Sequence, residues 1–282
     1  MCKQPYTVRK EYSSGFRSIP VPCNKCPECI SKRVAEWKWR MEQEFKVSTS
    51  PLFITLTYNQ QSVPRADIDI SGVQRSFKVL NPKHLTDYLK LLRFHWDKQS
   101  EAKIRYFAVG EYGSKKGRPH YHIILMNCDD VRLICDTWKY GRVDISPVRS
   151  IDSVGYCLGY LKKKCKFVPP NHPQFSSKSR GLGRNYINAE TISYHNRRLE
   201  NCTVDLNNGR TIHLPKFMKD KLYTETNRLH LTHYLQTVAD KALDEKVLAQ
   251  VRATGKTEEQ VRKEFYVEPF IEKKPKIFPT VF

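Results

Sequence analysis

The chain has 282 residues, enough for one large domain or for a smaller domain with an appendage. With 39% hydrophobic, 28% charged and 11% aromatic residues, its composition is that of a folded protein and excludes a disordered or collagen-like chain. Lys and Arg number 49 against 29 Asp and Glu, and the resulting net charge of +20 favours a polyanion as partner, with an anionic membrane surface as the alternative.

The sequence lacks a run of the roughly 18–20 apolar residues that would span a bilayer, and its start, MCKQPYTVRK, lacks the apolar centre of a signal peptide. We therefore expect a cytoplasmic protein without a membrane partner. Nine cysteines is an odd number, and most of them are scattered. This pattern favours reduced thiols, some of them bound to a metal, over a disulfide framework.

Apolar residues at helical spacing predict an amphipathic helix over residues 31–48, and LFITLT at residues 52–57 predicts a buried strand. A polar loop is expected from Tyr58 to about Asn81. Asn81 and Pro82 then provide an N-cap and a first-turn proline for a second helix. The apolar stripe of this helix comprises Leu85, Tyr88, Leu89, Leu92 and Trp96.

Two strands, at residues 104–111 and 120–126, flank a Gly-containing polar stretch that suits a hairpin turn. A short helix near residues 130–139, a strand at 141–148 and a helix at about 153–166 follow. Residues 168–185 form a basic loop rich in Pro, Ser and Gly, which we do not expect to be a core element. A hairpin around Asn207-Asn208-Gly209 precedes helix-forming sequence from about residue 215 to 265, with a break near Thr254-Gly255, and an extended tail.

This order predicts an α+β fold in which helices gather against a central antiparallel sheet. Three segments are expected. Residues 1–48 form a Cys-rich metal-binding element with the first helix, residues 49–214 form the core, and residues 215–282 form a helical extension and tail.

His120 and His122 stand two apart on a predicted strand, so their side chains point to the same side. Two imidazoles about 7 Å apart along a strand can bind one divalent ion, although a bare pair of this kind can equally be two half-exposed sheet histidines. If the turn centres on Lys115-Lys116 or Lys116-Gly117, Glu111 lies opposite one of them. The resulting nitrogen and oxygen donor set suits Mg²⁺ or Mn²⁺.

Tyr156 and Tyr160 are spaced four apart on a predicted helix, which places both phenols on one face. A phenol has a pKa near 10, so as a nucleophile it needs a metal that polarises the phosphate and a nearby cation that favours the phenolate. Lys162, Lys163 and Lys164 can supply that cation. The alternative is a core-facing aromatic pair followed by solvated lysines.

Cys23, Cys26 and Cys29 form a C-x2-C-x2-C cluster that could bind structural zinc with a fourth ligand, for which Cys2 is the nearest candidate. The spacing after Cys29 disfavours an iron–sulfur cluster, and three unligated thiols in a turn are the alternative. Basic residues gather around the tyrosine helix and the loop after it, where they would bind DNA or only solubilise a face. They are Lys162, Lys163, Lys164, Lys166, Lys178, Arg180 and Arg184.

The motifs LFITLT, Glu111 with HYH, and YxxxYxxK occur in the order found in HUH endonucleases, the rolling-circle replication initiators. The paired tyrosines resemble the two-tyrosine group of that family. Met1-Cys2, VPCNKCPEC and SRGLG resemble the replication initiation proteins of gokushoviruses in the microvirus family. The similarity covers roughly residues 1–220.

This resemblance implies an RRM- or palm-like sheet, with Glu111, His120 and His122 as ligands of Mg²⁺ or Mn²⁺. Tyr160 would be a nucleophile with Lys163, or alternatively Lys164, as its cation. Tyr156 would be the second nucleophile, although Gly159 stands where the family pattern has a lysine.

The implied activity is nicking and rejoining of single-stranded DNA at a replication origin in the cytoplasm of a bacterial host, through a 5′-phosphotyrosine link. Host replication helicase or polymerase are further candidate partners. The competing hypotheses are a non-catalytic, basic, zinc-containing nucleic-acid-binding protein and an HUH transposase or relaxase.

Overall fold

The structure is a computed structural model that describes residues 5–12, 15–114, 116–148, 168–206 and 209–266, together with residues 2, 154, 155, 157 and 159. The chain divides into two compact units, one of residues 34–186 and one of residues 1–33 with 187–282. Helix α1 (Pro27–Phe45) begins in the second of these and ends in the first. It starts earlier than the sequence predicted because Pro27 suits the first turn of a helix.

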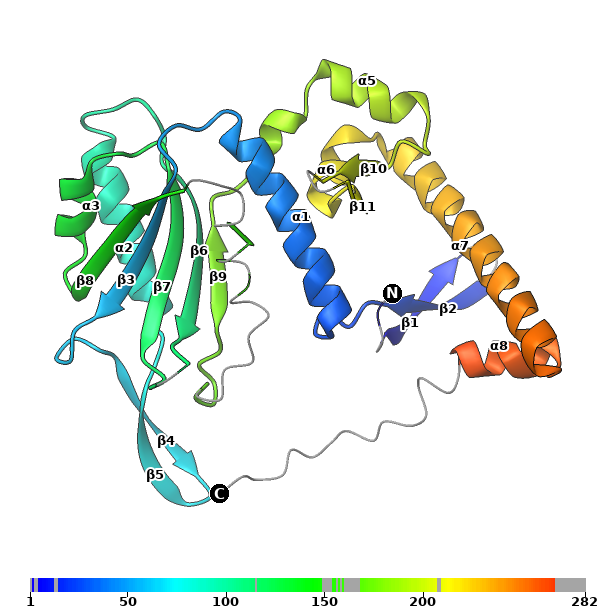
Figure 1. The fold of residues 1–282 in the computed structure, drawn as a ribbon, viewed down its shortest axis with the longest axis horizontal. Helices are drawn as coiled ribbons and strands as arrows, with labels where there is room; N and C mark the ends of the chain where they lie inside the picture. Colours follow the sequence, from blue (N-terminus) through cyan, green and yellow to red (C-terminus); the bar gives the residue numbers. More distant parts are fainter. Residues whose placement is uncertain are drawn as a thin grey trace. The chain divides into compact units, whose positions relative to one another are not determined.

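The centre of the 34–186 unit is a five-stranded antiparallel sheet with the strand order β8-β3-β7-β6-β9 (Figure 1). This sheet and its flanking helices confirm the predicted α+β class. Its strands are β3 (Leu52–Tyr58), β6 (Arg105–Tyr112), β7 (Pro119–Met126), β8 (Gly141–Pro147) and β9 (Phe175–Lys178).

Helices α2 (Pro82–Trp96) and α3 (Val131–Thr137) cover one face of the sheet. The Asn81 side chain accepts a hydrogen bond from the Lys83 amide (3.0 Å), as predicted for an N-cap. Every residue of the predicted α2 stripe is buried. The stripe packs on Tyr121, Ile123 and Leu125, which alternate with the histidines along β7.

The opposite face carries His120 and His122, and we call it the histidine face. Over β6 and β7 its apolar residues pack against Met41 of α1 and against Val154 and Cys157. Residues 154, 155, 157 and 159 are helical, in agreement with the helix predicted over residues 153–166.

Two segments predicted to be loops contain strands. Residues 58–81 include the hairpin of β4 (Arg65–Ile70) and β5 (Val73–Lys78), which extends away from the sheet in Figure 1. Both Ser71 and Gly72 have positive φ, as a tight hairpin turn requires, and this short turn in a charged segment escaped the sequence prediction. In the basic loop, β9 pairs with β6 at the sheet edge, and Leu182 is buried.

The other unit contains two hairpins and the C-terminal helices. The first hairpin, which the sequence analysis did not predict, is followed in chain order by the one expected around Asn207-Asn208-Gly209. Gly255, in the left-handed conformation, ends α7 at the predicted break. In chain order the elements are β1 (Tyr6–Tyr12), β2 (Gly15–Val21), the short helix α5 (Ala189–Arg197), β10 (Thr203–Asp205), β11 (Thr211–His213), α6 (Lys216–Leu222), α7 (Glu225–Thr254) and α8 (Glu258–Tyr266). Across the described ranges, every helix is too short or too polar to span a membrane. The predicted tail lies outside the described residues after 266, and the three-segment division remains a prediction.

Candidate active site and metal centres

The β6–β7 hairpin positions the predicted acid and histidines. Its register pairs Glu111 directly with His120, and Tyr112 with Pro119, which is the register expected for a turn centred on Lys115-Lys116. Because paired residues of antiparallel strands share a face, Glu111 lies on the histidine face. The structure therefore brings Glu111, His120 and His122 together as the sequence predicted.

The imidazole of His122 is held at both of its nitrogens. Its Nε2 lies 3.0 Å from Oε1 of Glu111, and its Nδ1 lies 3.1 Å from Oγ1 of Thr55 on β3. His122 and Glu111 are only 6% and 7% exposed. Phe53 stacks on the same ring, with centroids 5.6 Å apart. The ring orientation is therefore fixed by contacts from two neighbouring strands.

His120 is more accessible and less constrained. Its ring lies nearly parallel to that of His122, with centroids 6.4 Å apart and 12° between the planes. Its Nδ1 is buried without a hydrogen-bond partner of good geometry. Burial lowers the pKa of His120, while Glu111 and the Arg118 backbone act in the opposite direction. The neutral ring that burial favours is the form that can bind a metal.

Two imidazoles and one carboxylate form a donor set that fits Mg²⁺ or Mn²⁺. The buried, unsatisfied nitrogen of His120 and the convergence of Glu111 on Nε2 of His122 are consistent with such a site. The donor atoms are not yet gathered as in a formed metal centre. In the part of the chain that the structure describes, the cysteine cluster alone has three or more such donors already in place.

The predicted tyrosine helix reaches the sheet at the histidines. Tyr156 and Tyr160 lie outside the described residues, as do Lys162, Lys163, Lys164 and Lys166. Cys157, which follows Tyr156 in the sequence, is fully buried, and its Sγ lies 4.0 Å from the carbonyl oxygen of His122. Burial raises the pKa of this thiol, and the nearby Glu111 carboxylate adds to the shift. The segment that carries the tyrosines therefore contacts the strand that carries the histidines.

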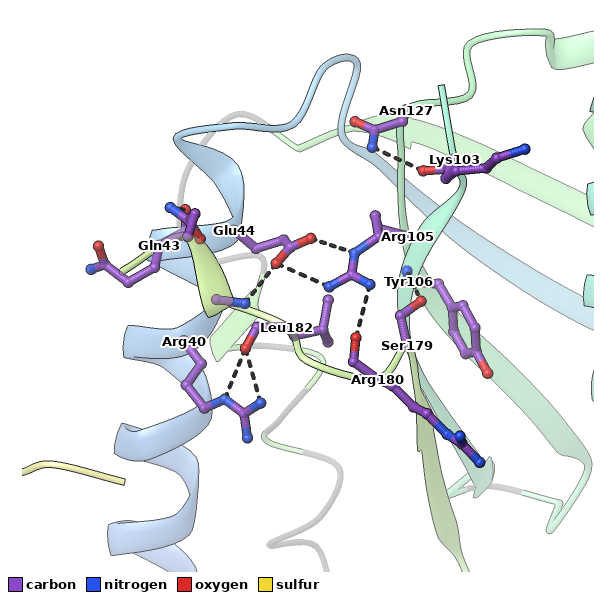
Figure 2. A network of polar contacts seen from close by, with 12 residues as sticks. Arg40, Gln43, Glu44, Lys103, Arg105, Tyr106, Asn127, Ser179, Arg180 and Leu182 are labelled. Atoms are coloured by element: carbon purple, nitrogen blue, oxygen red, sulfur yellow. Dashed lines mark hydrogen bonds and ion pairs between the residues drawn. The ribbon is translucent and has the colours of Figure 1, made fainter. Parts of the chain in front are cut away.

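The loop after β9 is clamped to α1 by a polar network (Figure 2). The Glu44 carboxylate accepts hydrogen bonds from Arg105 (2.6 and 3.3 Å) and from the Gly183 amide (2.6 Å). Arg40 donates two bonds to the carbonyl oxygen of Leu182 (3.0 and 2.9 Å), and burial lowers the pKa of this guanidinium to about 10. These contacts fix the loop by its backbone, so its basic side chains are left to point outward.

Three predicted DNA-binding residues lie on or next to this loop, and all three are exposed. Arg180 uses its carbonyl oxygen to accept from Arg105 (2.8 Å), and Arg184 begins a short 3-10 helix. Lys178, at the end of β9, places its Nζ 4.9 Å from the centroid of the Trp37 ring. The structure thus brings Arg180 and Arg184 to one exposed loop, while Lys178 engages an aromatic side chain.

Thr55 and Arg142 are additional residues of the histidine face that sequence reasoning did not select. The registers align Arg142, Thr57, His120 and Glu111 in one row across four strands. Arg142 is exposed on the edge strand β8, where it bonds to Asp144 (2.6 and 3.0 Å). The alternation of LFITLT could have assigned Thr55 and Thr57 to one face, but no local signal links Arg142 to the histidines.

The N-terminal cysteines form a second candidate centre. The Sγ atoms of Cys2, Cys23, Cys26 and Cys29 all lie within 4.8 Å of one another, which confirms the prediction that Cys2 joins the cluster. The backbone amides of Cys23 and Cys26 lie 3.3 and 3.2 Å from the Sγ atoms of Cys2 and Cys23. Burial, with the neighbouring thiols, raises the pKa of Cys29 to about 12. Four such thiols could hold a metal ion such as zinc, which would deprotonate them on binding.

Comparison with known proteins identifies relatives of this chain. Residues 51–165 match the model of the replication-associated protein ORF2 family. The replication-associated protein VP4 of Bdellovibrio phage phiMH2K is 25% identical over 266 residues, which cover 86% of this chain and 79% of the relative. The replication-associated protein ORF4 of Chlamydia phage 1 is 26% identical over 248 residues, or 77% of this chain and 58% of the relative.

A shorter match is closer in sequence. The replication-associated protein ORF2 of Spiroplasma virus 4 is 35% identical over 137 residues, which cover 48% of this chain and 40% of the relative. No solved structure matches the chain significantly. The chain is thus a relative of phage replication-associated proteins, and the predicted resemblance to microvirus-type replication proteins is confirmed.

Proposed function

We propose that this relative of phage replication-associated proteins is a replication initiator that nicks and rejoins single-stranded DNA at an origin. The observation that carries the proposal is the convergence at His122. The Glu111 carboxylate contacts its ring, and Cys157, from the segment that contains Tyr156 and Tyr160, contacts its carbonyl oxygen. This places an acid, two imidazoles and a tyrosine-bearing helix around one strand of the sheet.

Glu111, His120 and His122 are the residues that would hold Mg²⁺ or Mn²⁺. When bound, such an ion draws negative charge from the scissile phosphate. Tyr160 is the proposed nucleophile. Its phenol oxygen forms a bond to phosphorus as the bond to the 3′ oxygen breaks, and the phenol loses a proton while the leaving oxygen gains one. Lys163, or alternatively Lys164, favours the phenolate.

The product of this step is a 5′-phosphotyrosine link that retains the phosphodiester energy, so the same site can rejoin strands. Tyr156 is proposed as the second nucleophile. With one tyrosine linked to the old end, the other could cut again and release a closed circle of unit length. The glycine at position 159 leaves Tyr156 without the lysine that follows Tyr160, which makes Tyr160 the stronger nucleophile of the two.

The proposed DNA path combines the clamped loop with the uncovered part of the histidine face. Arg180 and Arg184, with Lys162, Lys166 and Lys178, supply charge for phosphates on one side of the site. On the other side, over β3 and β8, the face is polar and open, and Arg142 is exposed there in the same row as His120. A strand crossing this face would meet cations before and after the histidines.

The cysteine cluster is proposed to bind structural zinc through Cys2, Cys23, Cys26 and Cys29. Such a site joins the chain start to the beginning of α1 and contributes directly to folding. A cytoplasmic site of action in a bacterial host, and contacts of the helical extension with host helicase or polymerase, complete the proposal.

A non-catalytic nucleic-acid-binding protein is the alternative that the net charge of +20 favours, since that charge alone accounts for DNA affinity. Overlapping single-stranded oligonucleotides from the genome that encodes the chain, incubated with the protein and Mn²⁺, separate the two functions. A nickase forms an adduct that survives denaturation. The adduct should be lost in Tyr160→Phe and kept in Tyr194→Phe, a matched change at an exposed tyrosine. DNA binding without an adduct in the wild type, with Mn²⁺ or Mg²⁺, would support the binding protein instead. An HUH transposase or relaxase would differ only in the DNA that it cuts.

A further inference from the structure

We infer that Thr55 is a positioning residue of the cation site, acting through the His122 ring. Its hydroxyl group would hold the ring in both hydrogen-bonding states that the site must pass through, without and with a bound cation. This inference rests on the proposed function, because it assumes that Nε2 of His122 binds a divalent cation.

The geometry of the β3–β7 pair supports this role. Thr55 and His122 are directly paired in the strand register, so their side chains lie side by side on the histidine face. The Oγ1 atom of Thr55 is 3.1 Å from Nδ1, on the opposite side of the ring from the Nε2 contact with Glu111. At 6% exposure His122 has little access to water, which makes the protein contacts of its nitrogens costly to lose.

The two nitrogens of a neutral imidazole have opposite roles, one donating and the other accepting. The Glu111 carboxylate can only accept, so the neutral ring carries its hydrogen on Nε2 in this contact, and Nδ1 accepts the hydroxyl hydrogen of Thr55. A cation needs the lone pair of Nε2. On binding, the Nε2 proton is released to solvent and Nδ1 takes up another, with no net change in protonation. Nδ1 must then donate instead of accept.

A threonine hydroxyl can serve both states, because it donates to Nδ1 in one and, after rotating about its Cβ–Oγ bond, accepts from Nδ1–H in the other. A histidine that binds a metal generally donates its second nitrogen to such a partner, which fixes both tautomer and orientation. A carbonyl group could only accept, and a valine could do neither. The β-branch of Thr55 further restricts χ1 and keeps the hydroxyl in place.

The test is Mn²⁺ binding to the full chain, measured by electron paramagnetic resonance without DNA. Thr55→Val keeps the shape of the side chain and removes the hydroxyl, and it should lower the affinity about 10–100-fold. Thr55→Ser, which keeps the hydroxyl, should bind nearly as well as the wild type. Thr57→Val is the matched control on the same strand and face, and it should leave the affinity unchanged.

A second measurement uses the wild type alone and so does not depend on a variant that folds. Nitrogen NMR of His122 should show hydrogen on Nε2 without cation and on Nδ1 with saturating Mg²⁺. Unchanged Mn²⁺ affinity in Thr55→Val, with a large loss in Glu111→Gln, would overturn the role of Thr55 and leave the cation site standing. No Mn²⁺ binding by the wild type would overturn the cation site, and this inference with it.

Discussion

Gly183 lies directly against the backbone of Arg40. A Cβ atom at Gly183 would come within 2.7 Å of the Arg40 carbonyl oxygen and 3.2 Å of its Cα, and the φ angle of Gly183 is +76°. The close approach lets the Gly183 amide reach the Glu44 carboxylate (2.6 Å), while Arg40 holds the carbonyl of the preceding residue. A side chain at this position would separate the basic loop from α1.

Gly183→Ala should therefore destabilise the protein beyond the cost of its backbone conformation. Gly72→Ala is the matched control, because Gly72 also has a positive φ (+83°) but has open space where its Cβ would stand. We expect about 1–2 kcal/mol for the conformation in each variant, and about 1–3 kcal/mol more at Gly183 from the contact with α1. Denaturant unfolding measures the difference, and equal losses in the two variants would contradict the tight contact.

Glu111→Gln should weaken divalent-cation binding at least about 10-fold, because it replaces a charged oxygen donor by a neutral amide at the ring of His122. Isothermal titration with Mn²⁺ gives the affinity. Glu101→Gln makes the same change at an exposed position and should bind Mn²⁺ like the wild type. A variant at Glu111 with wild-type affinity would remove this residue from the proposed ligand set.

Protein purified without chelator should contain about one zinc ion per chain, held by four thiolates. Cys2→Ser removes one of them and should lower both the zinc content and the melting temperature, as should treatment of the wild type with a strong chelator. Cys135→Ser changes a thiol outside the cluster and should keep the metal. Mass spectrometry of metal content measures the outcome, and a zinc-free wild type would count against the site.

Acid should destabilise the protein in part through His84. Its Nδ1 lies 3.0 Å from the hydroxyl oxygen of Tyr58, and its ring stacks on Tyr140 with centroids 4.1 Å apart. Burial lowers the pKa of His84, with Lys83 adding to the shift and Asp87 opposing it. The unfolded chain therefore binds a proton at a pH where the folded chain resists it, so the stability contributed by His84 is present above about pH 6.5 and falls as the pH drops.

Melting temperatures at pH 7.5 and 5.5 test this effect. The wild type should lose more on acidification than His84→Gln, which cannot be protonated in this range. Burial also lowers the pKa of His195 and His213, so the variant should keep part of the loss. An identical loss in both proteins would show that His84 does not contribute.

The sequence alone determined the elements whose signals are local. Alternation placed both histidines on one face, helical periodicity identified α2 with its complete buried stripe, and the short spacings of three cysteines marked a metal-binding cluster. These signals are reliable because side-chain direction follows directly from the 3.6- and 2-residue periods. The order of the motifs was likewise enough to indicate the family.

Tertiary structure decided which distant residues meet. Cys2 joins the cluster from more than 20 positions away, Thr55 reaches His122 from another strand, and the Gly-rich loop proves to contain a sheet strand and a fixed dock for Glu44. Each of these depends on strand register or on chain packing between separate elements. Such relationships arise from non-local pairing and complementary shape, which composition and spacing do not encode.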